Sequence, residues 1–511
     1  MNIGKLNKKQ IFILFLSASL FFNIISAAIL ILRIASTEKS DDIYNNIYNG
    51  NSSPKYIFLF IGDGLGYSQM ALASQYKTTV EGKPRESGDN LAMLDFDITG
   101  MAFTDNASTI IGESAASASA MASGIKTYGT YLNYDTDGNK AETITEKLKK
   151  QLNYRIGIIS SVAINHATPA AFYAYQDSRY DNNGAIFLDL LNSNFDFFGG
   201  GIIFGIGEAE AISGKNFWEL LNENKYLFVR SREDILSLEN NGDKIIAVAP
   251  KLDIYGTLPY MIDNASKDSD ALSLAKLTKK CIELLYNDNG FYIMVEGGKI
   301  DWCGHANDSA TLIHEVFAFD EAISEAIDFY KKNPADTLII VIGDHETGGL
   351  SLGYSETYTH TYLQYLQKQK ISYSEFSRII SQHRQHQTPF DEILSDIEYY
   401  FGIPRGYDGS SNFYFNEEEI QRLKAAYEQS MIEPSMRYFT MSDYASYGMY
   451  DPLTTVITNI TNKKSGIAWG TFSHTFSPVP VFAMGSGADL FSGSYHLSDI
   501  FHKLKNLLDL K

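Results

Sequence analysis

Three continuous apolar runs constrain the fold of this 511-residue chain more than any other feature of its sequence. They span residues 56–61, 291–295 and 337–342, and such runs are typical of strands buried on both faces of a parallel sheet. An acidic residue and glycines follow each run directly. In an open α/β sheet, ligands bind at the edge formed by the carboxyl ends of the strands. The pattern therefore predicts an α/β fold, a mostly parallel sheet sandwiched by helices, with one polar site at its edge.

The residues that follow the three runs are of the types that bind metal ions. They are Asp63 after the first run, Glu296, Asp301 and His305 after the second, and Asp344 and His345 after the third. Mixed oxygen and nitrogen ligands suit zinc, whereas an all-oxygen site suits magnesium. Each residue alone is better explained as a helix cap or a hydrogen-bonded bystander. Together they predict a metal centre.

Ser114 is the candidate nucleophile. It follows Gly112 and Glu113 and opens an Ala-rich stretch that predicts a helix from near Ser114 to Gly124. A hydroxyl at a helix N-terminus lies in positive potential, close to free N–H groups that suit a phosphate. The alternative is that Ser114 merely caps a closely packed helix, and this segment alone favours that alternative.

Three further residues could complete a phosphate site. Thr168 follows the strand-like residues 156–162 and could add a hydroxyl oxygen to a magnesium site. Arg179 offers forked donors that match two phosphate oxygens. His474 precedes the short apolar run 479–485, again an imidazole beside a predicted strand.

With these motifs in this order, the chain resembles the alkaline phosphatases, from about residue 54 to 352 and again from about residue 467. The resemblance implies hydrolysis of phosphate monoesters through a phosphoserine on Ser114, with release of phosphate outside the cytoplasm. It also implies two Zn²⁺ and one Mg²⁺ per chain. The implied ligands are Asp63, Asp344 and His345 for one zinc, Asp301, His305 and His474 for the other, and Asp63, Thr168 and Glu296 for magnesium, with Arg179 clamping the phosphate.

The chemistry of the residues agrees with this resemblance. Two adjacent cations can stabilise the attacking and leaving oxygens of an in-line displacement at phosphorus. Zinc lowers the pKa of a bound hydroxyl, so Ser114 would need no protein base, in line with the absence of an obvious Ser–His–Asp arrangement. Groups that work once deprotonated favour an alkaline optimum.

Four positions depart from the common family pattern. Glu113 stands where Asp usually precedes the nucleophile, and Gly343 stands where Ala usually precedes the Asp–His pair. His166 and Trp302, expected beside the metal ligands, replace the Asp and Lys of the best-known bacterial members. We expect these two to weaken magnesium binding and to ease product release.

The charge of the chain bears on its partners. The net charge is −19, and no basic stripe with interleaved aromatics is present, which argues against nucleic acid as the main partner. Small phosphomonoesters remain compatible.

The alternatives are a phosphodiesterase of the same superfamily and a non-catalytic surface protein that binds metal or phosphate. A sulfatase is disfavoured because Ser114 lacks the Pro and Arg elements that such enzymes need.

Residues 1–34 are predicted to be a signal peptide or an N-terminal membrane anchor. Lys5, Lys8 and Lys9 precede the apolar segment 11–32, which is long enough to span a bilayer, whereas small residues at 26–28 resemble a cleavage site. We expect an exported protein, periplasmic or extracellular, with a polar tether over residues 35–53. Residues 54–511 would form the catalytic domain.

Residues 354–465 are predicted to be an insertion that forms a lid or a crown over the site, or a subunit contact in a homodimer. Helices are expected from Thr361 to about Gln385 and from Asn416 to about Met431. A solvated structural insertion is the alternative. Cys281 and Cys303 are expected to be unbonded.

Overall fold

The computed structural model describes residues 53–264, 271–407, 409 and 411–511. The predicted signal or anchor and, apart from Ser53, the predicted tether lie outside the described residues. Within the described part, no helix is both long enough and apolar enough to cross a bilayer.

A ten-stranded sheet forms the centre of the fold and is mostly parallel, as predicted. Its strands, in spatial order, are β14 (Gly493–His496), β2 (Ile98–Phe103), β13 (Val479–Gly485), β8 (Thr337–Gly343), β1 (Tyr56–Gly62), β7 (Phe291–Glu296), β3 (Arg155–Ser160), β4 (Phe197–Gly200), β6 (Lys244–Val248) and β5 (Tyr226–Val229). Among these strands only β13 runs antiparallel to its neighbours, β2 and β8. The three apolar runs became β1, β7 and β8, which lie side by side and are buried at every residue.

Helices cover both faces of the sheet. Those outside the insertion are α2 (Tyr67–Thr79), α3 (Ser114–Ser123), α4 (Ile144–Lys147), α5 (Ala167–Ala170), α6 (Asn183–Asn192), α7 (Ile206–Ser213), α8 (Phe217–Glu223), α9 (Arg232–Ser237), α10 (Leu274–Leu285), α11 (Lys299–His305), α12 (Ser309–Tyr330) and α18 (Ser498–Leu507). The long helix α12 packs against α2 and α10, while α3 packs against α5 and α18. Cys281 in α10 and Cys303 in α11 are buried and unbonded, as expected.

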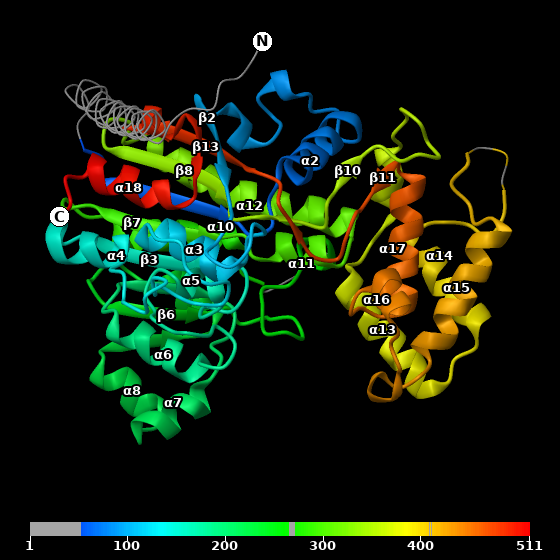
Figure 1. Cartoon of the computed structure of the whole chain (residues 1–511), viewed down its shortest axis with the longest axis horizontal. Helices are drawn as coiled ribbons and strands as arrows, with labels where there is room; N and C mark the ends of the chain where they lie inside the picture. Colours follow the sequence, from blue (N-terminus) through cyan, green and yellow to red (C-terminus); the bar gives the residue numbers. More distant parts are fainter. Residues whose placement is uncertain (1–52, 265–270, 408, 410) are drawn as a thin grey trace, which may run out of the picture. The chain divides into compact units, whose positions relative to one another are not determined.

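The helical insertion, residues 354–465, forms a group of its own beside the sheet, yellow to orange in Figure 1. It contains η5 (Leu363–Lys368), α13 (Tyr373–His386), α14 (Phe390–Phe401), α15 (Glu417–Ser430), η6 (Pro434–Met436), α16 (Met441–Tyr447) and α17 (Pro452–Lys464). These elements enclose a separate apolar cluster that includes Phe376, Ile397, Leu423 and Ile457. Two short strands, β10 (Ser351–Leu352) and β11 (Ile467–Ala468), pair and hold the ends of the insertion together.

The helix expected from Thr361 to about Gln385 was wrong as one element. A short 3-10 helix ends at Lys368, and α13 starts only after Ser372, whose hydroxyl accepts the Glu375 N–H and caps it. The intervening residues turn toward Asp308, which accepts bonds from the Gln369 amide and the Tyr373 N–H. A buried carboxylate therefore interrupts the helix that local sequence favours. The second expected helix is confirmed as α15.

Candidate active site

The site lies where β1, β7 and β8 end. Ile61 of β1 is in register with Glu296 of β7, and Gly62 is in register with Gly343 of β8. Asp63 and Asp344 therefore leave their strands at the same level, two residues beyond the level of Glu296. All three carboxylates are fully buried.

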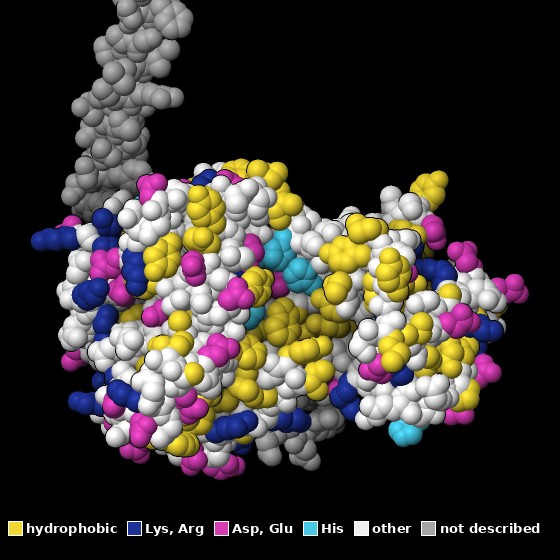
Figure 2. All heavy atoms as spheres, turned by 60° about the horizontal axis from the view of Figure 1, so that its bottom comes forward, with side chains coloured by type: hydrophobic (Ala, Val, Ile, Leu, Met, Phe, Trp, Pro, Cys, Tyr) yellow, Lys and Arg dark blue, Asp and Glu magenta, His cyan; other side chains and the backbone are white. Residues whose placement is uncertain are grey.

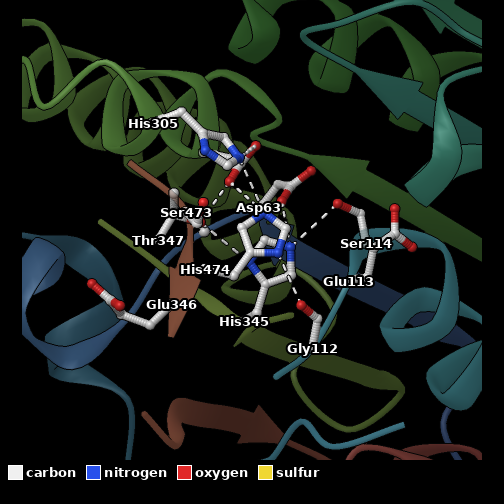
Figure 3. A network of polar contacts seen from close by, with 12 residues as sticks. Asp63, Gly112, Glu113, Ser114, His305, His345, Glu346, Thr347, Ser473 and His474 are labelled. Carbon is white, nitrogen blue, oxygen red and sulfur yellow. Dashed lines mark hydrogen bonds and ion pairs between the residues drawn. The ribbon is translucent and has the colours of Figure 1, made fainter. Parts of the chain in front are cut away.

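One group of potential ligands joins β1 to β8. Nε2 of His345 lies 3.3 Å from Oδ1 of Asp63 and 3.4 Å from Oδ2 of Asp344. The Gly64 N–H donates to Oδ1 of Asp344 at 3.0 Å, which leaves Oδ2 to face the group. Ser114 Oγ, at the start of α3, lies 3.2 Å from Nε2 of His345 (Figure 3). The candidate nucleophile thus borders this group.

A second group joins α11 to the short strand β12 (His474–Thr475). Asp301 and His305 lie one turn apart on α11, with 3.4 Å between Oδ2 and Nε2, and Nε2 of His474 lies 3.5 Å from Oδ1 of Asp301. Nδ1 of His305 lies 2.7 Å from the Phe472 carbonyl, and Nδ1 of His474 lies 2.9 Å from the Gly112 carbonyl. With Nδ1–H donating to a carbonyl, both imidazoles turn Nε2 toward the group as acceptors, which is the arrangement that metal ligation needs.

The two groups adjoin. The rings of His345 and His474 stack with centroids 3.7 Å apart, and Asp301, His345 and His474 offer ligand atoms within 4.8 Å of one another. Pairing of β12 with β9 (Glu346–Thr347) sets this contact, because His474 lies opposite Thr347. Two cations in these groups would therefore be close neighbours, as a displacement at phosphorus requires.

A third group lies behind Asp63. Asp63, His166 and Glu296 offer ligand atoms within 4.8 Å of one another. The Ser160 hydroxyl donates to Oε2 of Glu296, and buried Thr168 lies close enough to the same carboxylate to lower its pKa. The structure brings all the predicted magnesium ligands together. It also brings in His166, which the sequence placed only beside them.

Several buried polar atoms at these groups have no hydrogen-bond partner among the described residues. They are both carboxylate oxygens of Asp63, Oδ2 of Asp344, Oε1 of Glu296, Oγ1 of Thr168 and Nδ1 of His166. An unsatisfied buried polar group costs about 1–3 kcal/mol, and more when it is charged. Cations would supply the missing partners, and the oxygen and nitrogen donors present fit both zinc and magnesium. The residues therefore fit the metals that the sequence implied.

Three carboxylates of the site, unlike that of Asp301, resist ionisation in the absence of cations, as their raised pKa values indicate. Burial, followed by repulsion from neighbouring carboxylates, raises the pKa of Asp63 well above its usual value. Burial raises the pKa of Glu296 and of Asp344 to about 7 each. Burial opposes a charge on His305, but the attraction of Asp301 prevails and raises the His305 pKa to about 9. This crowding of acids is typical of a site that holds divalent ions.

Arg179 is tied to the N-terminus of α3. Its guanidinium forms an ion pair with Glu113, whose other oxygen accepts the Ala115 N–H at 2.8 Å and caps the helix. Nη2 of Arg179 lies 3.3 Å from Nε2 of His166. Because Glu113 is the cap, the hydroxyl of Ser114 is not engaged in capping, and the alternative explanation for this serine is wrong. Arg179 is thereby held against the start of the helix that carries the serine.

Sequence reasoning missed the roles of Lys299, the first residue of α11, and of Tyr255, a neighbour of that helix. Lys299 is buried, and its Nζ lies 2.7 Å from Oδ2 of Asp253 and 2.6 Å from the Leu258 carbonyl. Tyr255, on the same loop as Asp253, meets the ring of Trp302. The one signal that could have pointed to Lys299 is the presence of a lysine within the motif 295–305, whose other residues are mostly buried. No signal in the sequence pointed to Tyr255.

Buried carboxylates and imidazoles around a serine, at the edge of a parallel sheet, define a metal-dependent hydrolase. The family model described as alkaline phosphatase matches residues 54–510. Alkaline phosphatase 3 of Bacillus subtilis is 28% identical over 455 residues, covering 87% of each chain. The crystal structure of a cold-active alkaline phosphatase from Shewanella sp. superposes with a TM-score of 0.71 at 28% identity, covering 89% of this chain and 99% of that one. The chain belongs to the alkaline phosphatase family.

The fold has further support in the crystal structure of Thermus thermophilus alkaline phosphatase, with a TM-score of 0.74 at 22% identity, covering 90% of this chain and 92% of that one. Membership of the family confirms the predicted fold class and the predicted enzyme class. The protein is a metal-dependent phosphatase that hydrolyses phosphate monoesters.

Proposed function

We propose that Ser114 accepts the phosphoryl group and that the three ligand groups bind two Zn²⁺ and one Mg²⁺. In this proposal Asp63, Asp344 and His345 bind one zinc, and Asp301, His305 and His474 bind the other. Asp63, Thr168 and Glu296 bind magnesium, with His166 beside them. The convergence of unpartnered carboxylate oxygens of Asp63, Asp344 and Glu296 near Ser114 carries the proposal.

Each residue of the site has its own role in this proposal. Bound cations would lower the pKa of the serine hydroxyl and offset the negative charge that develops at phosphorus. Ser114 presents its oxygen from the first turn of α3, where free N–H groups favour an anion. Arg179, held by Glu113, orients two phosphate oxygens with its forked donors. His305 and His474, anchored through Nδ1, hold their Nε2 atoms in place throughout.

The cellular setting is also a proposal. An apolar segment after three lysines supports export with the catalytic domain outside the cytoplasm, anchored through residues 11–32 or released by cleavage. A homodimer, and a role of the helical insertion as lid or subunit contact, are part of the same proposal. Size-exclusion chromatography with light scattering on the purified protein measures the oligomeric state.

The central test is a phosphatase assay with defined metals. Hydrolysis of p-nitrophenyl phosphate is expected to stop in a chelator and to return on addition of Zn²⁺ with Mg²⁺, with about two zinc and one magnesium ions per chain by elemental analysis. The diester bis(p-nitrophenyl) phosphate is expected to react far more slowly. Full activity in chelator would overturn the metal assignment, and a faster reaction with the diester would favour the phosphodiesterase alternative.

A further inference from the structure

Aromatic side chains extend outward from Arg179, the proposed phosphate clamp. Trp302, on α11, meets the ring of His166 at a centroid distance of 6.2 Å and a tilt of 72°, and His166 in turn contacts Arg179. Trp302 also meets the ring of Tyr255, at a centroid distance of 5.8 Å and a tilt of 87°. Trp302 is partly exposed, and Tyr255 is 49% exposed. Figure 2 shows apolar side chains gathered on the face next to exposed histidines.

The loop that carries Tyr255 is fixed in place. Oδ1 of Asp253 accepts the N–H groups of Tyr255 and Thr257, each at 3.0 Å, and Oδ2 accepts the Thr257 hydroxyl at 2.6 Å. Buried Lys299 donates to the same Oδ2 at 2.7 Å. Gly256 supplies the positive φ of 76° that closes the turn. A ring held in this way needs little ordering when it contacts a ligand, so the contact retains most of its binding energy.

The placement of the two rings points to the leaving group of the substrate. In an in-line displacement the leaving oxygen lies on the side of phosphorus opposite the attacking oxygen. Ser114 borders the group that contains His345, so the leaving group extends toward the other group, on α11. Trp302 is carried by that same helix. The exposed rings therefore lie where the organic part of the substrate leaves the phosphate clamp.

We propose that Trp302 and Tyr255 form a platform for a flat ring in the leaving group, so that the enzyme favours aryl phosphates over aliphatic phosphates. This inference rests on the proposed roles of Ser114 and α11. Aromatic rings attract one another edge to face or in offset stacks, and a half-exposed tyrosine retains one free side for such a contact. A glycerol moiety has no ring and gains nothing there.

The test compares kcat/KM for phenyl phosphate and glycerol 2-phosphate in variants of the loop. Tyr255→Ala is expected to lower kcat/KM for phenyl phosphate about five- to tenfold and that for glycerol 2-phosphate less than twofold. Tyr255→Phe keeps the ring and should keep the preference. Ile254→Ala, which removes a 63% exposed neighbour on the same loop, is the matched control and should change neither value. For each substrate, kcat/KM of a variant is divided by that of the unmodified enzyme, which cancels the intrinsic reactivity of the esters.

Binding without turnover gives a second measurement. Phenylphosphonate should inhibit Tyr255→Ala about five- to tenfold more weakly than the unmodified enzyme, whereas methylphosphonate should inhibit both equally. Equal losses on both substrates would mean a structural role only, and an unchanged ratio would mean that no ring binds there; either result overturns the inference. Hydrolysis of glycerol 2-phosphate by the unmodified enzyme, lost in Ser114→Ala, would show that the proposed function stands even if the platform does not.

Discussion

The carboxyl edge of the sheet and the helical insertion differ in how far their buried polar groups are satisfied by hydrogen bonds. Side chains cap the starts of four of the five α-helices described in the insertion, with Ser372 on α13, Asn416 on α15, Thr440 on α16 and Asp451 on α17; α14 starts after Pro389 without such a cap. Among the described residues of the insertion, every buried side-chain polar atom has a partner. At the sheet edge, Asp63, Asp344 and Glu296 keep buried oxygens unpartnered. The buried polar groups of the insertion are thus satisfied within the protein, whereas those of the edge depend on what the edge binds.

The apolar contacts follow the same division. The cluster within the insertion is separate from the cluster that joins the sheet to α10 and α12. The contacts between the two regions are apolar at Leu363, Leu366 and Tyr373, which belong to the cluster of the sheet, and polar at Asp308, which accepts bonds from Gln369 and Tyr373. Regions with separate cores can open separately, and their stabilities can be measured separately.

The largest expected effect falls on the sheet edge alone. Ser114→Ala should lower kcat/KM at least about 10⁴-fold, because the acceptor oxygen is lost, while zinc and magnesium contents stay unchanged. Ser123→Ala, at the other end of the same buried helix, is the control and should keep full activity. Turnover near that of the unmodified enzyme in Ser114→Ala would remove the serine from the mechanism.

Removing the metals should destabilise the edge of the sheet and leave the insertion unchanged. A chelator should lower the stability of the edge by about 4 kcal/mol for each site previously saturated at a thousandfold excess over Kd. Amide hydrogen exchange should then speed up in the turns that follow β1 and β8 and stay slow in α14 and α15. Equal loss of protection in both regions would show that the insertion also depends on metal.

A cavity in the core of the insertion should destabilise the insertion and leave the active site unchanged. Ile457→Ala, at a fully buried position of α17, should lower the free energy of unfolding of the insertion by roughly 3 kcal/mol. Activity on glycerol 2-phosphate at 25 °C should stay within about twofold. Exposed Lys424→Ala, on α15, is the control for stability. A large loss of activity in Ile457→Ala would show that the insertion shapes the metal site.

The smallest effect concerns pH. Because Asp344 and Glu296 have pKa values of about 7 in the folded state, their protonated forms favour folding at low pH, and this contribution is lost as pH rises from about 4 through 7. Asp301, whose pKa is lowered, acts in the opposite sense mainly below pH 4. Burial lowers the pKa values of His166 and His345, which therefore also act in the opposite sense, up to about pH 6.5. Between pH 5 and 7, the metal-free protein should lose roughly 2 kcal/mol more stability in urea denaturation than metal-free Glu296→Gln, which lacks one of the two carboxyl groups. The same pH dependence in both proteins would contradict the assignment.

The sheet could be predicted from sequence because its central strands are buried on both faces. Continuous apolar runs gave β1, β7 and β8 to within a residue at each end, and the acidic turns after them located the site. The order of these strands and the pairing of His474 with Thr347 depend on contacts between distant residues. Local patterns carry no information on such pairings, so the ligand groups were assembled only by resemblance.

The insertion was harder to predict because its burial overrides local propensity. Helix α17 has the sequence PLTTVITNITNKK, rich in β-branched residues that disfavour an isolated helix, yet ten of its residues are buried. The Asp451–Pro452 start was a usable cap signal, as were Pro389 before α14 and Gly402 after it. Contacts within the insertion decide the structure of these segments.

The antiparallel strand β13 of the ten-stranded sheet has a consequence for the order in which the enzyme is completed. Val481 of β13 pairs with both Gly100 and Ile342, so β2 and β8 stay apart until β13, which follows both in the sequence, enters between them. His474 arrives with the same segment. Closure of such long-range contacts is slow and leaves strand edges exposed to misassembly in the meantime. A ribosome must therefore release residues 474–485 before the metal centre can be complete, so full occupancy by metal follows the synthesis of β13.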